Sequence, residues 1–298
     1  MSRFGKISAI LTIIAIVPVV AFARDSRKDP AAIGNRKVDK GLNFYTIEQE
    51  LALGKQLEAE VEKQAKMVDD PMISEYVNRL GQNLVRNSDV TFPVQFKVIQ
   101  SDEMDAFTLP GGYVFIDTGL IKLSSNEAEL ASALAHELGH AAARHATRQA
   151  SRNRLLGVGT FPLVLFGGIP GLAVRQAANA VVPMAFLSFS REYETEADLL
   201  GLQYLWKAGY DPNASIDLFE AMQSTERRQT GKVGKLFRSH PPTPDRIEKT
   251  QKNIDTLLPH RDSYVINTSE YEEVRARLYD LLQKYSMSPA SPPTLNRN

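Results

Sequence analysis

The pentapeptide His-Glu-Leu-Gly-His at residues 136–140 constrains this chain more than any other feature, because it lies in a run that favours a helix. At about 100° per residue, His136 and His140 lie one turn apart on one helix face, so both imidazoles can reach a single metal ion. Glu137 projects beside them, and apolar residues flank it on both sides. A carboxylate in such a run needs a polar or metal partner. The pentapeptide therefore predicts a metal site.

This arrangement is the H-E-x-x-H motif of zinc peptidases, in which two histidines bind Zn²⁺ and the glutamate is the general base. A catalytic zinc usually takes three protein ligands and leaves one position for water. The chain contains no cysteine, which excludes a thiolate zinc site, a thiol nucleophile and a disulfide framework. We therefore expect one Zn²⁺ per chain, held by histidine and carboxylate, in a hydrolase that acts on polypeptides.

Candidates for the third ligand follow in a second predicted helix, at residues 191–208. Glu194 and Asp198 are four residues apart and share a helix face, whereas Glu196 points roughly the opposite way. The spacing alone leaves both Glu194 and Asp198 open as ligands.

Two other histidines are weaker candidates. His145 lies five residues beyond His140, which is about 140° around a continuous helix, so it is predicted to face elsewhere. His260 sits in a Pro-His-Arg-Asp loop and is most simply a solvated turn residue. Neither residue is expected to bind the metal.

Four sequence elements occur in order along the chain: Ala-Phe-x-Leu-Pro-Gly-Gly at 106–112, the HELGH pentapeptide, Ser-Arg-x-x-Glu-x-x-Ala-Asp at 190–198, and His-Pro-Pro at 240–242. From about Thr46 to Ile247, the chain resembles the Ste24, HtpX and BepA type of zinc metallopeptidases, peptidase family M48. The resemblance implies an α+β, mainly helical fold of the zincin-like (gluzincin) class. A small β-sheet is expected beside the HExxH helix.

The resemblance also implies roles for the two acidic candidates. Glu194 matches the family's third zinc ligand. Asp198 matches an aspartate that lies behind the ligands, where it can accept a hydrogen bond from the outer nitrogen of His136 or His140 and fix the ring's orientation. The alternative for Asp198 is a solvated carboxylate on the helix surface.

Two later residues also match the family. His240 matches its His-Pro turn, and Arg246 matches the arginine that follows this turn. The resemblance implies that Arg246 stabilises the oxyanion with a permanent charge. For His240 it implies either the same role or a place at the fourth zinc position, where the imidazole keeps the enzyme latent until substrate displaces it. The alternative is a helix-entry residue without a catalytic role.

The chain departs from the family pattern in two places. Asp105 stands where many relatives carry Asn, which bears on the contact between that turn and a substrate. Membrane-embedded relatives carry paired spans between the two metal helices, whereas this chain has only a Gly-rich segment there. It is therefore more similar to the soluble periplasmic branch, which implies an envelope enzyme that handles misfolded or damaged proteins, outer-membrane proteins among them.

Two other functions stay open. One is a chaperone-like envelope protein with low turnover and a structural zinc. The other is an integral membrane protease of the prenyl-protein type. A retained general base beside both histidines favours hydrolysis over the first, because a structural zinc site has no use for such a base.

The N-terminus carries the features of a targeting signal. Arg3 and Lys6 precede an apolar stretch at 7–23 that ends in Ala-Phe-Ala, which is typical of a secretory signal peptide over residues 1–23. The alternative is an uncleaved helix at 7–23 that anchors the protein to the inner membrane. Both predict a catalytic part in the periplasm. The formal charge of zero predicts no nucleic-acid partner.

The remaining domain boundaries follow from composition. Residues 24–43 are charged and contain Pro and Gly, which predicts a mobile leader; 44–285 form one metallopeptidase domain with C-terminal helices, and 286–298 a disordered tail. Residues 155–174 carry no charge, but their glycines and prolines disfavour a regular helix. They predict a hydrophobic flap over the cleft or a peripheral contact with the membrane, with membrane insertion as the alternative.

Inside the domain, a capping box at Thr46 opens an amphipathic helix and Pro71 opens a second. Alternation at 94–98 and a β-branched and aromatic run at 113–118 predict two strands. The helix that carries HELGH is predicted to run to about Thr147. The strand at 113–118 can offer its edge to an extended peptide, unless it is an internal strand.

Overall fold

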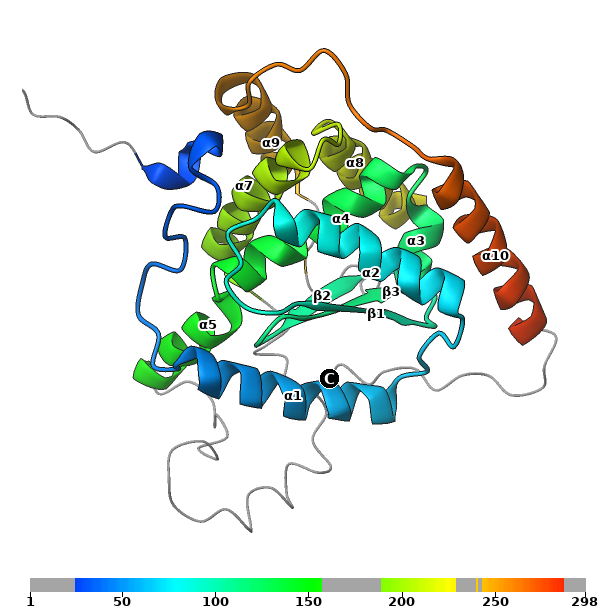
Figure 1. Ribbon diagram of the computed structural model, residues 1–298, viewed down its shortest axis with the longest axis horizontal. Helices are drawn as coiled ribbons and strands as arrows, with labels where there is room; N and C mark the ends of the chain where they lie inside the picture. Colours follow the sequence, from blue (N-terminus) through cyan, green and yellow to red (C-terminus); the bar gives the residue numbers. More distant parts are fainter. Residues whose placement is uncertain (1–24, 157–188, 229–239, 241–242, 287–298) are drawn as a thin grey trace, which may run out of the picture.

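A three-stranded sheet lies in the middle of the molecule, with helices on both of its faces (Figure 1). The computed structural model describes residues 25–156, 189–228, 240 and 243–286. One face of the sheet packs against α1, and the other against α2 and α4. The bounds of these helices are Ile47–Gln64 for α1, Pro71–Arg86 for α2 and Glu127–Ala142 for α4.

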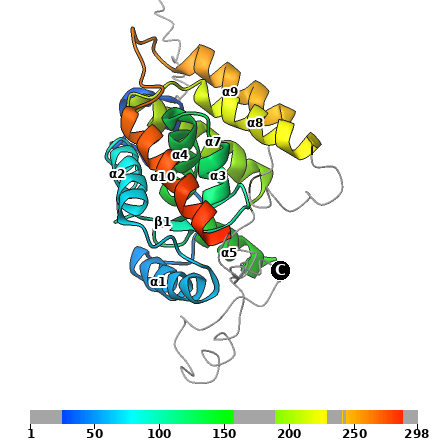
Figure 2. The ribbon, with the colours of Figure 1, turned by 90° about the vertical axis from the view of Figure 1, so that its right-hand side faces the viewer.

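An outer layer of helices covers α4 on the side away from the sheet. It consists of α7 (Arg191–Lys207), α8 (Ala214–Arg228) and α9 (Pro244–Leu257), and α8 and α9 run side by side in Figure 2. α10 (Ser269–Ser286) packs on α2 and on the short α3 (Thr118–Leu123). As a result, α4 is enclosed between the sheet and the outer layer.

The sheet has the strand order β1-β3-β2. β1 (Gln95–Ile99) pairs in parallel with β3 (Tyr113–Asp117), and β2 (Ala106–Leu109) pairs with β3 in antiparallel. The Pro-Gly-Gly turn joins β2 to β3 as a hairpin. The predicted strands are present, but β3 is the central strand of the described sheet, so the predicted free edge at 113–118 is wrong. The edge beside α4 belongs to β2.

α4 is buried on nearly every side: 15 of its 16 residues are buried, so its polar groups must find partners inside the protein. Two glycines bring α4 and α7 together. A Cβ on Gly139 would lie 2.6 Å from the carbonyl oxygen of Ala197, and a Cβ on Gly201 would lie 2.7 Å from that of Ala135. This close approach allows short carboxylate side chains of α7 to reach the histidines of α4.

α4 ends at Ala142 and α5 (His145–Leu155) begins in a new direction, so the prediction of one helix to about Thr147 is wrong. The break is at Arg144, whose φ of 55° lies in the left-handed region. Its guanidinium donates to Glu50 Oε2 at 2.6 Å and to the carbonyl of Tyr45 at 2.8 Å. These contacts with the start of α1 stabilise the turn, and a local pattern does not reveal them.

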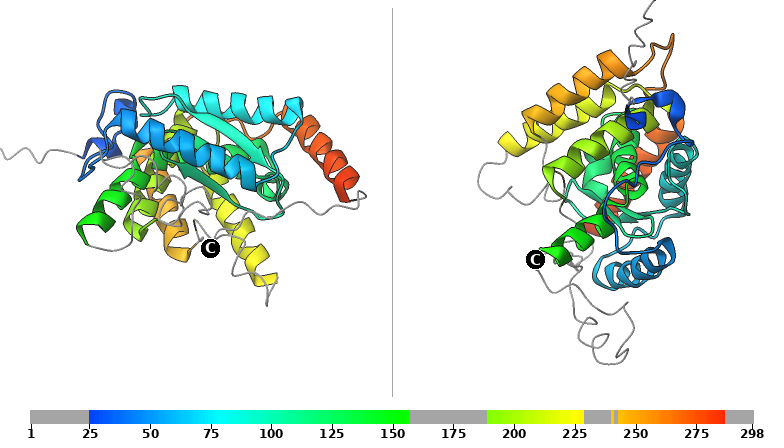
Figure 3. Two further views of the ribbon diagram at one scale, coloured as in Figure 1. Left: turned by 90° about the horizontal axis from the view of Figure 1, so that it is seen from below. Right: turned by 90° about the vertical axis from the view of Figure 1, so that its left-hand side faces the viewer.

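The N-terminal segment, residues 25–38, is packed against α7 and contains two short 3-10 helices, η1 (Ser26–Lys28) and η2 (Pro30–Ala32). Ile33 and Val38 are each 3% exposed, and Arg36 forms a buried ion pair with Asp89 at 2.9 Å. The sequence predicts a mobile leader at 24–43, whereas in the structure charged residues of this segment pair with the buried carboxylates of Glu196 and Asp89. Figure 3 shows the segment in blue along one side of the molecule.

Several predictions lie outside the described residues: the signal peptide or anchor at 1–23, the tail at 287–298, and all but the first two residues of the flap at 155–174. Within the described part of the chain, none of the helices combines the length and the apolar character that crossing a membrane requires.

Candidate metal centre

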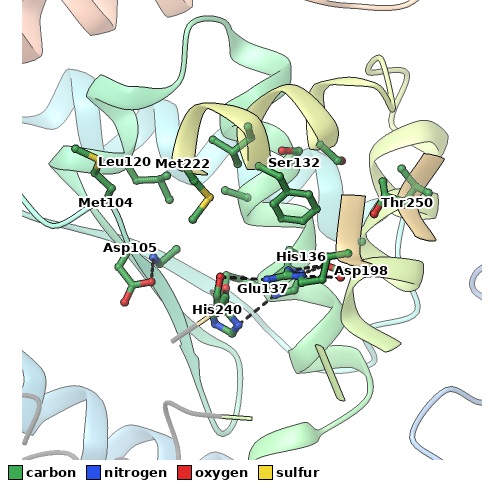
Figure 4. Close-up of a pocket in the computed structure, with 18 residues that line it drawn as sticks. Met104, Asp105, Leu120, Ser132, His136, Glu137, Asp198, Met222, His240 and Thr250 are labelled. Carbon is green, nitrogen blue, oxygen red and sulfur yellow. Dashed lines mark hydrogen bonds and ion pairs between the residues drawn. The ribbon is translucent and has the colours of Figure 1, made fainter. Parts of the chain in front are cut away.

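Four side chains from three parts of the chain converge beside α4. They are His136 and His140 from α4, Glu194 from the first turn of α7, and His240 from the segment before α9; one ligand atom of each lies within 4.8 Å of the others. His136 Nε2 lies 3.1 Å from His140 Nε2 and 3.5 Å from Glu194 Oε2. His240 Nδ1 lies 2.8 Å from Glu194 Oε1. Figure 4 shows His136 and His240 facing one another.

The atoms of this cluster fit a divalent metal ion. Imidazole nitrogens and a carboxylate oxygen are the donors that zinc and similar metals prefer. Among the described residues, Glu194 Oε2 is a buried atom without a hydrogen-bond partner. A cation bound in the cluster would satisfy this oxygen, and buried polar atoms without a partner are uncommon in proteins.

Electrostatics also prepare these groups to bind a cation. Burial alone would raise the pKa of Glu194, but the charge of His240 and a hydrogen bond from His136 hold it well below its ordinary value, so the carboxylate is ionised. Burial lowers the pKa of His140 well below its ordinary value, which keeps that imidazole neutral. Burial opposes the charged form of His136 too, yet its hydrogen bond to Asp198 raises its pKa to about 9. A metal would therefore displace a proton from His136.

Asp198 and Arg246 stand behind His136. Asp198 Oδ1 lies 2.9 Å from His136 Nδ1, the ring nitrogen opposite the cluster. Arg246 donates to both Asp198 oxygens, at 2.8 and 2.6 Å, and to the carbonyl of His240 at 3.1 Å. Arg246 thus connects the support of His136 to the segment that carries His240.

Glu137 is 2% exposed, and its carboxylate lies between the sheet and the cluster. The hydroxyl of Thr108 on β2 donates to Glu137 Oε2 at 2.7 Å and lies 3.1 Å from the Glu137 carbonyl. The other oxygen, Oε1, lies 3.2 Å from His240 Nε2. One oxygen is therefore held by the sheet, while the other faces the cluster.

Comparison with known proteins agrees with this geometry. Residues 71–254 match the profile of peptidase family M48, and this range contains all four residues of the cluster. The chain belongs to peptidase family M48. The predicted family and the mainly helical, zincin-like fold with a small sheet are therefore confirmed.

The M48 chain is also similar to named proteases. It is 29% identical over 223 residues to the beta-barrel assembly-enhancing protease of Yersinia pestis, which covers 72% of the chain and 46% of the relative. It is 32% identical over 233 residues to the putative enzyme of that name from Vibrio cholerae, covering 74% and 48%. It is 33% identical over 178 residues to the mitochondrial metalloendopeptidase OMA1 of Schizosaccharomyces pombe, covering 59% and 52%. The chain spans about half the length of these curated relatives.

The sequence does not predict the contacts that three residues make around the M48 site: Thr108, His145 and Glu196. Thr108 occupies the variable position of the Ala-Phe-x-Leu-Pro-Gly-Gly element, and its contact depends on the packing of β2 against α4. His145 contacts His140 because the helix breaks at Arg144, and the continuous-helix angle does not apply. Glu196 does face away from Glu194, as predicted, but it faces His145.

An open pocket adjoins the cluster between α4, α7 and α8 (Figure 4). His136, Glu137 and His240 lie on its wall, as does Asp105. Most of the remaining lining is apolar and comes from Met104, Ala106, Leu120, Ala133, Leu202, Leu218, Phe219 and Met222. The M48 centre is thus accessible to a ligand with an apolar side chain.

Proposed function

We propose that the chain is a zinc-dependent endopeptidase of the bacterial cell envelope that hydrolyses peptide bonds of misfolded or damaged proteins. The observation that carries the proposal is the buried Glu137 carboxylate beside four convergent ligand groups, with one oxygen facing them. A structural metal site does not need an ionisable group in that position. This arrangement favours hydrolysis over a binding protein with a structural zinc.

In the proposed enzyme, His136, His140 and Glu194 hold the zinc. When bound, zinc supplies a positive charge that polarises a carbonyl group and lowers the pKa of a water molecule to about 7. Asp198 accepts a hydrogen bond from His136 Nδ1, which keeps the ring proton on that nitrogen, so His136 Nε2 is free to act as a ligand. The neutral His140 and the ionised Glu194 are the other two proposed zinc ligands.

Glu137 is the general base of the proposed reaction. Its Oε1 takes a proton from the attacking water and passes it to the leaving amine. Thr108 occupies Oε2 and so prevents the carboxylate from rotating away from the cluster. The chain therefore presents one defined oxygen to the reacting atoms.

Glu137→Gln tests this assignment, because the amide keeps the shape of the side chain but cannot accept the proton. We expect casein cleavage by the zinc-loaded variant to fall by a factor on the order of 10²–10⁴ with zinc content unchanged. The matched control is His260→Gln, in the exposed loop, which should cleave as the parent does. Cleavage by Glu137→Gln at the parent's rate, with zinc bound, would falsify the role of Glu137.

His240 is proposed to occupy the fourth ligand position and to keep the enzyme latent until substrate displaces it. Its imidazole lies between Glu137 Oε1 at 3.2 Å and Glu194 Oε1 at 2.8 Å, where an incoming carbonyl would also have to lie. Removing it by His240→Ala should therefore raise the rate of casein cleavage, by about threefold to tenfold for a blocking contact worth about 1 kcal/mol. A lower rate would instead support oxyanion stabilisation by His240 and contradict the latch.

Arg246 remains a candidate for oxyanion stabilisation, but its contacts favour a positioning role. Its guanidinium donates to Asp198 and to the carbonyl of His240, and it stacks on Phe219 at 4.6 Å. We therefore propose that Arg246 acts mainly through Asp198 and through the turn that carries His240.

The proposed location and substrates rest on the predicted signal peptide and on the relatives. Proteins named beta-barrel assembly-enhancing proteases favour envelope polypeptides as substrates, and outer-membrane proteins are one proposed class. The apolar cavity beside Glu137 suits a large apolar side chain, which damaged proteins expose. Release of the protein from cells by osmotic shock would support a periplasmic enzyme. Resistance of the protein to carbonate extraction would instead support a membrane-anchored enzyme.

A further inference from the structure

A line of buried polar groups leads from the metal centre to the N-terminal segment. His145 Nδ1 lies 2.9 Å from His140 Nδ1, the ring nitrogen that the ligand cluster does not use. His145 Nε2 lies 3.1 Å from Glu196 Oε2, and Glu196 Oε1 accepts a hydrogen bond from Arg27 at 2.6 Å. The side chain of His145 is fully buried. These contacts connect residue 27 to a metal ligand.

Only one placement of protons satisfies this line when His140 binds a metal. The Nε2 of His140 must then be unprotonated, so its single proton sits on Nδ1 and points at His145. His145 Nδ1 must accept that hydrogen bond, which leaves the His145 proton on Nε2. There it is donated to the Glu196 carboxylate, an acceptor. The network therefore selects the tautomer of His140 that a metal needs.

The surroundings of His145 and Glu196 restrict their movement. The imidazole of His145 stacks on Tyr193, with ring centroids 4.4 Å apart and an interplanar angle of 15°. Arg148 donates to Glu196 Oε2 at 3.2 Å and lies over the same tyrosine ring at 4.8 Å. Two guanidinium groups thus hold the Glu196 carboxylate in the orientation that accepts from His145.

We propose that His145 and Glu196 are positioning residues that hold His140 as a metal ligand, and that Arg27 of the N-terminal segment completes this support. His136 has a direct carboxylate partner in Asp198, whereas His140 reaches its carboxylate through a second imidazole. The proposal rests on the metal site of the proposed function, but it does not depend on peptide hydrolysis. Loss of an outer partner of a ligand typically weakens metal binding by about 10–100-fold.

Two substitutions of His145 separate a positioning role from simple packing. His145→Phe keeps the ring but removes the acceptor, and we expect the zinc Kd, measured by chelator competition, to rise by about 10–100-fold. His145→Asn places an amide oxygen near the former Nδ1, where it can accept from His140, so it should recover most of this loss. Thermal unfolding of the metal-free proteins serves as the control, because a purely structural role would destabilise both variants and leave the zinc Kd unchanged. An unchanged Kd in His145→Phe, or equal weakening in both variants, would overturn the proposal.

Arg27 offers a milder test that does not disturb the core, because a third of its side chain is exposed. Arg27→Met should weaken zinc binding by about threefold to tenfold, less than the loss of a direct outer partner. Lys28→Met is the matched control, since Lys28 is the next residue of the same segment and is exposed. It removes the same charge and should leave the zinc Kd at the value of the parent. Equal weakening of zinc binding by both changes would show that the charge of the segment matters rather than the contact with Glu196, and would overturn the role of Arg27.

Failure of the proposed function gives a different result. If the parent binds zinc tightly but does not cleave casein, the endopeptidase proposal fails while the Kd measurements still test His145. If the parent cleaves casein and the Kd is insensitive to His145, only the positioning proposal fails.

Discussion

α4 and α7 both build the metal centre, but in different ways. In the proposed enzyme, α4 contributes two ligands and the base within five consecutive residues of one buried run. α7 carries its carboxylates on two faces: Glu194 and Asp198 contact His136, and Glu196 contacts His145. Under the proposed function, α4 therefore supplies the reacting groups, while α7 supplies the third ligand and orients both histidines.

The largest expected effect is a difference in zinc Kd between substitutions on the two faces of α7. Glu194→Gln removes the proposed third ligand, so we expect the zinc Kd to rise by more than about 100-fold, beyond the range for outer partners. Glu196→Gln, two residues away on the opposite face, should raise the Kd by about 10–100-fold at most. Chelator competition measures both values. An equal rise in the zinc Kd of both variants would show that the two faces of α7 do not differ in this way.

An intermediate effect should follow from separating α4 from α7. In Gly201→Ala the new Cβ would lie 2.7 Å from the Ala135 carbonyl oxygen, so the helices must move apart. We expect a loss of about 1–3 kcal/mol in the free energy of unfolding of the metal-free protein in urea. Thr195→Ala, on the half-exposed side of α7, should stay within about 0.5 kcal/mol of the parent. Equal stability of the two variants would show that this contact does not hold the helices together.

The smallest effect concerns support of α4 from the sheet rather than from α7. Thr108→Val keeps the shape of the side chain but leaves Glu137 Oε2 without its hydroxyl donor. We expect kcat for casein to fall about tenfold, which corresponds to about 1.4 kcal/mol for a hydrogen bond to a charged group. Thr108→Ser should retain most of the parent's kcat, and the zinc Kd should be unchanged in both variants. No rescue by serine would assign the effect to packing instead.

The half of the site that follows from helix periodicity could be predicted from the sequence. The HELGH spacing places His136 and His140 on one face of α4, and the spacing of four places Glu194 and Asp198 together on α7. The strands and the capping box at Thr46 follow in the same way from short patterns. Local rules suffice here because each depends on residues within one turn or one strand.

The other half depends on contacts between distant segments, which no local pattern reveals. His145 turns back to His140 because Arg144 adopts a left-handed conformation held by Glu50 and the carbonyl of Tyr45. β3 becomes an internal strand because both β1 and β2 pair with it. The segment from Asp25 is charged and rich in turns, yet it is ordered by buried carboxylates far along the chain.

The N-terminal segment also bears on when the centre forms during folding. Its contacts with α7 join residues 169 and 167 positions apart, from Arg27 to Glu196 and from Arg36 to Gln203. Contacts of such long sequence separation gain stability only after the chain between them has closed, which slows folding. We therefore expect His140 to reach its final orientation only in the last stage of folding. The proposed hydrolase, if assembled in this order, would be restrained from cutting its own incompletely folded copies.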